Sequence, residues 1–247
     1  VGTPRETVLR VVRLIARLGF SVATWRAISD LEPLIRDVAR SGVVPRFSYS
    51  QDGEDAVLQV VLPEEGFYVD VGAHHPERFS VTKVLYDKGW RGVNIDITRS
   101  IEKDFAERRP RDINVLGLVG KVGEVSLYRF AEPALNTTDA ERAERLVASG
   151  RKRKSIEHHV ARPLEEILAE HGVSGPIDLL SIDVEGADFE VLSSLDWSTR
   201  DVGAVLIEDS AEGEGGGSPI SEFLAKLGYV PATTFLRSVL YVRRKVA

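Results

Sequence analysis

From about residue 66 onward, short runs of apolar residues alternate with segments whose apolar and polar positions recur at helical spacing. The apolar runs predict strands at residues 67–71, 92–97, 113–119, 177–183 and 202–208. Helical patterns intervene, for example over residues 80–88, 100–108 and 188–195. Nearly continuous apolar runs are typical of a parallel sheet that is covered on both faces. The alternation therefore predicts an α/β fold built on a doubly wound, mostly parallel sheet.

The C-terminal part of the chain departs from this alternation. Residues 228–235 and 238–243 predict two strands with almost nothing between them, so they must pair as an antiparallel hairpin and complete a seven-stranded sheet. A parallel sheet that ends in such a hairpin is typical of the class I methyltransferase (Rossmann-like) fold. Residues 120–160 form an insertion, with a strand at 125–130, a polar turn at 136–139 and a helix at 140–148, and we expect it to serve as a lid or substrate wall.

Residues 1–46 predict a helical extension that precedes the α/β domain of residues 47–247. Helices are expected at 8–18 and 24–40, and the first carries arginines along one face and apolar residues along the other. Such a helix packs on the body or on a second subunit of a homo-oligomer, or it makes a peripheral contact with an anionic membrane. Near the other end, the glycine-rich stretch at 213–217 predicts a mobile loop or lid.

Composition and charge narrow the possible functions. The chain is 43% apolar and 28% charged, as in ordinary globular proteins, and no run approaches the roughly 20 apolar residues of a membrane span. It has no cysteine, which excludes disulfides, thiol nucleophiles and Cys-ligated metals and makes the cytoplasm the expected compartment. After residue 49 there are 34 acidic residues against 24 basic ones, which argues against a nucleic-acid-binding surface.

Acidic residues stand at the carboxyl ends of four predicted strands: Asp70, Asp96, Asp183, and Glu208 with Asp209. In an open parallel sheet, ligands bind beyond these ends. Gly72 lets the backbone approach a ligand closely, and Asp96 is placed to accept hydrogen bonds from a ribose diol. The loop at residues 71–76 lacks the G-x-G-x-x-G pattern that holds a pyrophosphate. A nucleoside without pyrophosphate suits this loop, and S-adenosylmethionine is the obvious candidate.

Five blocks, in order along residues 47–243, resemble the FkbM-type methyltransferases: SYSQDGED at 48–55, YVDVGAHHP at 68–76, GWRGVNID at 89–96, LNT at 135–137 and LSIDVEG at 180–186. The resemblance implies S-adenosylmethionine-dependent O-methylation, commonly of a hydroxyl on a sugar or other secondary metabolite. It also implies that the first block lies against the cofactor. The residues expected to bind the cofactor are Gln51, Glu54, Asp70, Gly72, Ala73, Asp96, Ile97 and Asp183.

A hydroxyl acceptor loses a proton when it is methylated, so a base or a metal is expected nearby. Asp183, Glu208 and Asp209 would converge on one cavity and repel unless a cation or a shared proton offsets them. Mg²⁺ or Ca²⁺ suits oxygen ligands and could lower the pKa of the acceptor hydroxyl. The alternatives are direct base catalysis by Asp183, Glu208 or His75, or purely structural carboxylates. In each catalytic version, Asp183 is the leading candidate.

Two other classes of function remain open from the sequence. One is an NAD(P)-dependent oxidoreductase or epimerase, although the missing glycine pattern counts against it. The other is a non-catalytic module that binds a nucleoside or sugar, although the acidic strand ends argue against it. The methyltransferase hypothesis expects a small-molecule or saccharide acceptor as partner.

Overall fold

The computed structural model describes residues 48–99, 101–209 and 217–244. The helices predicted at 8–18 and 24–40, and most of the glycine-rich loop predicted at 213–217, lie outside these residues. The membrane or subunit contact expected of the first helix therefore stays a prediction. None of the helices in the described part of the chain combines the length and the apolar character that crossing a bilayer requires.

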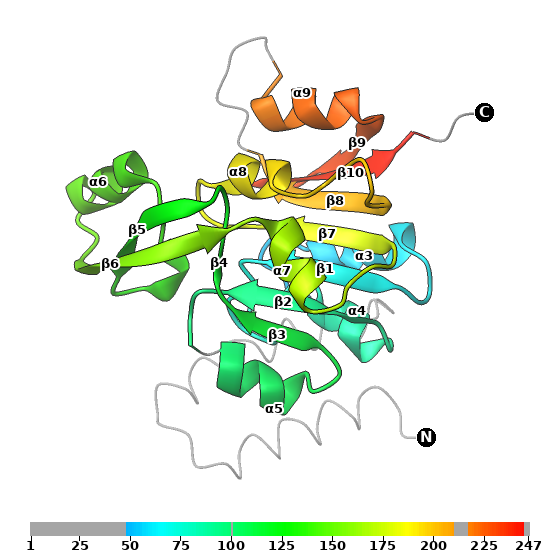
Figure 1. The fold of residues 1–247 in the computed structure, drawn as a ribbon, viewed down its shortest axis with the longest axis horizontal. Helices are drawn as coiled ribbons and strands as arrows, with labels where there is room; N and C mark the ends of the chain where they lie inside the picture. Colours follow the sequence, from blue (N-terminus) through cyan, green and yellow to red (C-terminus); the bar gives the residue numbers. More distant parts are fainter. Residues whose placement is uncertain (1–47, 100, 210–216, 245–247) are drawn as a thin grey trace, which may run out of the picture. The chain divides into compact units, whose positions relative to one another are not determined.

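A seven-stranded sheet forms the centre of the described unit, in the order β3-β2-β1-β7-β8-β10-β9 (Figure 1). Its strands are β1 (Phe67–Val71), β2 (Arg91–Asp96), β3 (Ile113–Leu116), β7 (Ile177–Ile182), β8 (Val202–Glu208), β9 (Tyr229–Thr234) and β10 (Ser238–Arg243). The first five run parallel to one another, whereas β10 is antiparallel to both β8 and β9. The predicted doubly wound sheet with its C-terminal hairpin is thus confirmed.

Helices cover both faces of this sheet because successive strand residues point in opposite directions. On one face, Val69 and Leu180 pack with α7 (Leu164–Glu170), α8 (Asp188–Ser193) and α9 (Pro219–Lys226). On the other face, Tyr68 and Leu179 pack with α3 (Glu54–Val61) and α4 (Lys83–Asp87). Beside β3 the chain forms a π-helical turn, η1 (Ile101–Phe105), which continues into α5 (Ala106–Arg108).

The prediction of a single strand over 113–119 is wrong, because the chain divides at Gly117. Only β3 (Ile113–Leu116) joins the main sheet, while β4 (Leu118–Val119) pairs with β6 (Arg153–Arg162) in a second sheet. The Gly117 N–H donates to the Asp96 carbonyl at 3.0 Å, at the end of β2. The apolar run therefore spans a change of sheet, since both halves need apolar residues for burial.

The insertion folds as a small sheet of its own, in the order β4-β6-β5. β5 (Gly123–Phe130) lies antiparallel to β6, and between them come η2 (Pro133–Leu135) and α6 (Ala140–Ala148). α6 begins where the Asp139 carboxylate accepts the N–H groups of Glu141 and Arg142, at 2.8 and 3.1 Å. The strand and the helix predicted in this region are both present.

The packing of β1 on β2 depends on a glycine. Gly92 lies beside Tyr68, which is fully buried and whose hydroxyl donates to the carboxylate of Asp112. A Cβ at position 92 would overlap both the ring and the carbonyl oxygen of Tyr68. The same Asp112 carboxylate accepts the Gly92 N–H at 3.0 Å, so neither the backbone nor the ring can move aside easily.

We expect Gly92→Ala to lower the free energy of unfolding by about 1–3 kcal/mol or more, because it overpacks a rigid site. Gly175→Ala is the matched control, since no heavy atom lies within 4 Å of the Cβ it adds, and it should change stability by no more than about 0.5 kcal/mol. Urea unfolding followed by circular dichroism measures both. Equal midpoints for the two variants would contradict this account of the contact.

Candidate active site

The carboxyl ends of the central strands meet where the chain changes direction across the sheet. After β1 the chain passes to β2 on one side, and later returns to place β7 on the other side. This switch point is the usual ligand site of doubly wound sheets. It brings together Gly72 after β1, Asp96 at the end of β2, Asp183 after β7 and Glu208 at the end of β8.

Gly72 is the point of closest approach between two of these ends. Its φ is +85°, a left-handed conformation that glycine adopts without strain, and a Cβ there would overlap the Asp183 carbonyl oxygen. Its N–H donates to the Ile95 carbonyl at 2.9 Å, and the Asp183 N–H donates to the Val71 carbonyl at 3.0 Å. The glycine thus lets the loops after β1 and β7 pack backbone against backbone.

A cleft with about 880 Å³ of empty space, counting its open mouth, lies above these strand ends. Gly72, Asp96 and Asp183 line it from the main sheet. The facing wall comes from the insertion, through Leu127, Pro133, Asn136, Thr137 and Thr138.

Asp96 is held with both carboxylate oxygens toward backbone donors. Oδ2 accepts the N–H of His74 at 2.8 Å, and Oδ1 accepts the N–H of Thr98 at 2.6 Å. Each oxygen keeps a second lone pair, so the carboxylate can accept further hydrogen bonds from a ligand diol. Asp96, Ile97 and Thr98 all line the cleft, as does the apolar Leu118. This end of the cleft therefore suits a nucleoside.

The insertion is tied to the loop after β7 through Glu185. The Thr137 hydroxyl donates to the Glu185 carbonyl at 2.5 Å, and Arg142 forms an ion pair with the Glu185 carboxylate. Glu185 has a φ of +60°, which is rare for a residue with a side chain and marks a position that its surroundings constrain. Sequence reasoning missed Arg142, because only the fold places the start of α6 beside residue 185.

A second cavity, with about 530 Å³ of empty space, shares Gln51, Gly72, Phe79 and Asp183 with the cleft. Its lining includes the acidic Glu54 and Asp70, the basic Arg237 and the neutral polar Ser181. The buried Ala73 lies there as well. The two cavities therefore meet beside Asp183. All eight residues expected to bind a cofactor line one or both of them.

The segment that precedes α3 is fixed over the second cavity. Asp55, fully buried, accepts hydrogen bonds from Ser48 and from the Tyr49 N–H, both at 2.7 Å. Arg237, in the turn between β9 and β10, forms an ion pair with Asp52 at 3.2 Å and donates to Gln51. Sequence reasoning did not single out Arg237, since nothing in its local pattern indicates that the hairpin turn reaches the first block.

Three carboxylates cluster beside the shared residue. Ligand atoms of Asp183, Asp188 and Glu208 lie within 4.8 Å of one another. Asp183 is exposed to the cleft, yet protein surrounds it on its other sides, and this burial together with Glu208 and Asp188 raises its pKa to about 7. Burial likewise raises the pKa of Asp188 to about 6, although its oxygens accept the N–H groups of Val184 and Gly186, both at 3.0 Å.

Asp209 and His75 were also predicted at this site, but their side chains form hydrogen bonds outside the carboxylate cluster. The Asp209 carboxylate accepts the Tyr241 hydroxyl at 2.6 Å and the Ser218 hydroxyl at 2.9 Å, so Asp188 takes the place expected for Asp209. His75 Nδ1 accepts the N–H groups of Glu77 and Arg78, at 3.1 and 3.0 Å, in a local turn. Its neighbour His74 is the histidine that lines the cleft.

The comparisons with known proteins identify the family of the chain. The sequence profile of the Methyltransferase FkbM domain matches residues 70–231, and the chain belongs to the FkbM methyltransferase family. It is therefore a methyltransferase, with the class I Rossmann-like fold that the strand order shows, and the family implies S-adenosylmethionine as its methyl donor. The open alternative of an oxidoreductase or epimerase is set aside accordingly.

Among solved structures, the chain is similar to a TehB-like SAM-dependent methyltransferase from Corynebacterium glutamicum. The two are 12% identical, the match covers 87% of this chain and 97% of that one, and the TM-score is 0.37. Among curated proteins, none matches the chain.

The raised pKa of Asp183 predicts a pH-dependent cost to folding. Between the unfolded value of about 3.9 and the folded value of about 7, the folded state holds a proton that the unfolded state releases. The group therefore favours folding at low pH, and this stability is lost as the pH rises through about 7. Asp183→Asn stays neutral, so we expect it to be more stable than the native protein at about pH 8 and less pH-dependent between about pH 5 and 8.

Urea unfolding at several pH values measures this effect. Glu102→Gln, which neutralises an exposed carboxylate outside the cluster, is the control and should reproduce the native pH dependence. If the free energy of unfolding of Asp183→Asn depended on pH as strongly as that of the native protein, the raised pKa of Asp183 would be contradicted.

Proposed function

We propose that this protein is an S-adenosylmethionine-dependent O-methyltransferase whose acceptor is a hydroxyl on a saccharide or a similar polyhydroxylated small molecule. The observation that carries the proposal is the meeting of two cavities at Asp183. One cavity suits a nucleoside, the other suits an amino-acid group, and a carboxylate with a raised pKa stands between them.

The nucleoside of the donor fits the cleft beside β2. Asp96 would accept hydrogen bonds from the ribose hydroxyls with the lone pairs that His74 and Thr98 leave available. Ile97 and Leu118 supply apolar surface for the adenine ring. Neither contact requires the glycine pattern that a pyrophosphate needs.

The amino-acid part of the donor fits the second cavity, which offers charges of both signs. Asp70 and Glu54 are carboxylates that can receive its ammonium group, and Arg237 is a cation that can receive its carboxylate. Both acids are buried, with exposed fractions of 5% and 4%, so an unpaired negative charge there would be costly without a cationic partner. Gly72 leaves the space for the chain that joins this part to the nucleoside.

The bound donor supplies an electrophilic methyl group on a sulfonium. The protein then has to align the acceptor oxygen behind that methyl and to remove the hydroxyl proton. The new oxygen–carbon bond forms as the sulfur–carbon bond breaks, the electron pair goes to sulfur, and the proton goes to Asp183. A carboxyl group whose pKa is about 7 is well matched to this task near neutral pH.

We propose that Asp183 acts as a base rather than as a ligand of Mg²⁺. Asp188, its neighbour in the cluster, already directs both oxygens to backbone N–H groups. The positive charge of Arg237 also acts on Asp183 and lowers its pKa, so the protein itself offsets part of the clustered negative charge. A shared proton then offsets the rest without a bound cation.

The acceptor is proposed to lie against the insertion, across the cleft from the donor. The wall there presents Asn136 and Thr138 beside Glu185, and such amide, hydroxyl and carboxylate groups form hydrogen bonds with sugar hydroxyls. The tie between the insertion and Glu185 would hold this wall at a constant distance from Asp183.

Asp96→Ala should weaken binding of S-adenosylhomocysteine, a stable analogue of the donor, by about 1.5–3 kcal/mol, the usual value for hydrogen bonds to a charged group. Calorimetry measures the loss, with Glu102→Ala as a control for a carboxylate outside the cleft. Native affinity in a folded Asp96→Ala variant would show that Asp96 has another role. Failure of the native protein to bind the analogue at millimolar concentration would contradict the proposed function itself.

Turnover, measured as S-adenosylhomocysteine release with a panel of neutral saccharides, should rise with pH and level off above about 7, because Asp183 must be deprotonated to accept the proton. Asp183→Asn should reduce kcat by about 100-fold or more while it still binds the analogue. Glu208→Gln should move the acidic limb to lower pH, since removal of a neighbouring negative charge lowers the pKa of Asp183.

Chelation separates this mechanism from the cation alternative. We expect excess EDTA to leave the turnover of the native protein unchanged. Turnover that EDTA abolishes and Mg²⁺ restores would favour a metal at the cluster instead. Activity that survives both EDTA and Asp183→Asn would contradict both roles of Asp183.

A further inference from the structure

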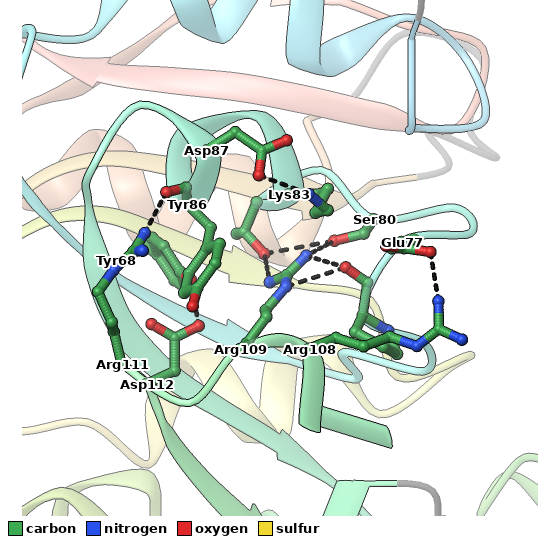
Figure 2. A network of polar contacts seen from close by, with 12 residues as sticks. Tyr68, Glu77, Ser80, Lys83, Tyr86, Asp87, Arg108, Arg109, Arg111 and Asp112 are labelled. Carbon is green, nitrogen blue, oxygen red and sulfur yellow. Dashed lines mark hydrogen bonds and ion pairs between the residues drawn. The ribbon is translucent and has the colours of Figure 1, made fainter. Parts of the chain in front are cut away.

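A fully buried arginine lies behind the loop that connects β1 to α4. Arg109 follows α5 and has no exposed surface. Its guanidinium donates to the Pro76 carbonyl at 2.6 and 2.9 Å, to Ser80 at 2.5 Å and to Thr82 at 2.8 Å. Figure 2 shows Arg109 within the polar network that also contains Ser80, Tyr68 and Asp112.

The acceptors of Arg109 within the described residues are all neutral. A buried cation without a bonded carboxylate is costly, and an apolar side chain of similar size would be expected if packing were its whole purpose. The charge of Arg109 also acts on Asp70, whose pKa it lowers. A hydrogen-bonded route from Arg109 to Asp70 runs through Thr82.

Thr82, also without exposed surface, connects Arg109 to the second cavity. Its hydroxyl oxygen accepts from Arg109 Nη1 at 2.8 Å, and its hydroxyl hydrogen goes to Asp70 Oδ2 at 2.6 Å. The direction of these two hydrogen bonds is fixed, because a guanidinium can only donate and a hydroxyl has only one hydrogen. Both bonds therefore point their hydrogens toward Asp70, where they stabilise a negative charge.

Asp70 needs such support in order to stay ionised. Burial raises its pKa, the negative charge of Asp96 adds to this, and the carboxylates of Glu54 and Asp183 stand around the same cavity. The hydrogen bond from Thr82, the charge of Arg109 and a hydrogen bond from Ser181 act in the opposite direction. Arg237 is the cation that lines this cavity, and it is paired with Asp52.

We propose that Arg109 and Thr82 are positioning residues, which hold the Asp70 carboxylate oriented toward the second cavity to receive the ammonium group of the methyl donor. This inference rests on the proposed function. Arg109 touches neither cavity, so its effect on the donor is exerted through Thr82 and Asp70. The hydrogen bonds to Pro76 add a second effect, because they also anchor the loop that lines both cavities.

Two ligands separate the specific role from a merely structural one. S-adenosylhomocysteine carries the amino-acid group, whereas 5′-methylthioadenosine has the same nucleoside and a sulfur but lacks that group. Thr82→Val preserves the shape of the side chain and removes the hydroxyl. We expect it to weaken S-adenosylhomocysteine about tenfold or more, as for a hydrogen bond to a charged group, and to change methylthioadenosine by less than about twofold.

Thr82→Ser retains a hydroxyl and should recover most of the lost affinity. Thr199→Val is the matched control, because its hydroxyl also donates to an aspartate, Asp196, at 2.9 Å but lies exposed and away from both cavities. Arg109→Lys keeps the charge but not the forked set of donors, and it should likewise weaken S-adenosylhomocysteine more than methylthioadenosine. Calorimetry gives the affinities, and thermal unfolding identifies variants that do not fold.

Each outcome of this experiment decides the question. Selective loss of S-adenosylhomocysteine, with rescue by serine, supports the positioning role even if Arg109→Lys does not fold. Equal losses for both ligands, or no loss in a folded Thr82→Val, overturn it. If Thr82→Val does not fold, Arg109→Lys decides: selective loss of S-adenosylhomocysteine affinity supports the role, and equal losses for both ligands overturn it. If neither variant folds, the network is essential to folding and the proposal fails. Failure of the native protein to bind S-adenosylhomocysteine would contradict the proposed function instead.

Discussion

The backbone contact between Gly72 and the Asp183 carbonyl is the constraint on which the site depends. The sheet places the ends of β1 and β7 side by side, but only a residue without a Cβ lets the following loops come this close. The contact lets both cavities share the boundary at Asp183. A larger residue would push the two loops apart, and Asp183 would lose its fixed place relative to Asp96 and Asp70.

The charges around this contact follow one principle, in which carboxylates near the strand ends are supported by hydrogen-bond donors from the loops packed against them. Asp70 is supported through Thr82 by Arg109, and Asp96 by two backbone N–H groups. Asp183 has the least support of the three, because its neighbours are Asp188 and Glu208. Burial and these two neighbours raise its pKa, at some expense of stability above neutral pH.

The insertion adds the wall of the cleft that faces the strand ends. Its small sheet joins the main body by way of β4, and its turn is fastened to the loop after β7 by Thr137 and Arg142. Changes in the length or composition of this wall would alter the acceptor side of the cleft and leave the strand ends as they are. This arrangement keeps the proposed specificity for the acceptor separate from the proposed binding of the donor.

The local pattern was sufficient to predict the main sheet and the acidic residues at its strand ends. A buried strand needs a run of apolar residues, and the strand ends where polar residues follow. The local pattern was insufficient wherever one apolar run serves two sheets, as at Gly117, or wherever contacts join residues far apart. Asp188 rather than Asp209 completes the carboxylate cluster, because the fold brings Asp188 close to Asp183 and Glu208. Asp209 instead accepts hydrogen bonds from the hydroxyls of Tyr241 and Ser218. Arg109, Arg142 and Arg237 acquire their roles only when the fold brings them to Thr82, Glu185 and Asp52. The sequence by itself determined which strands end in acidic residues, since that depends on neighbours along the chain, and the tertiary structure decided which charges face one another, since that depends on neighbours in space.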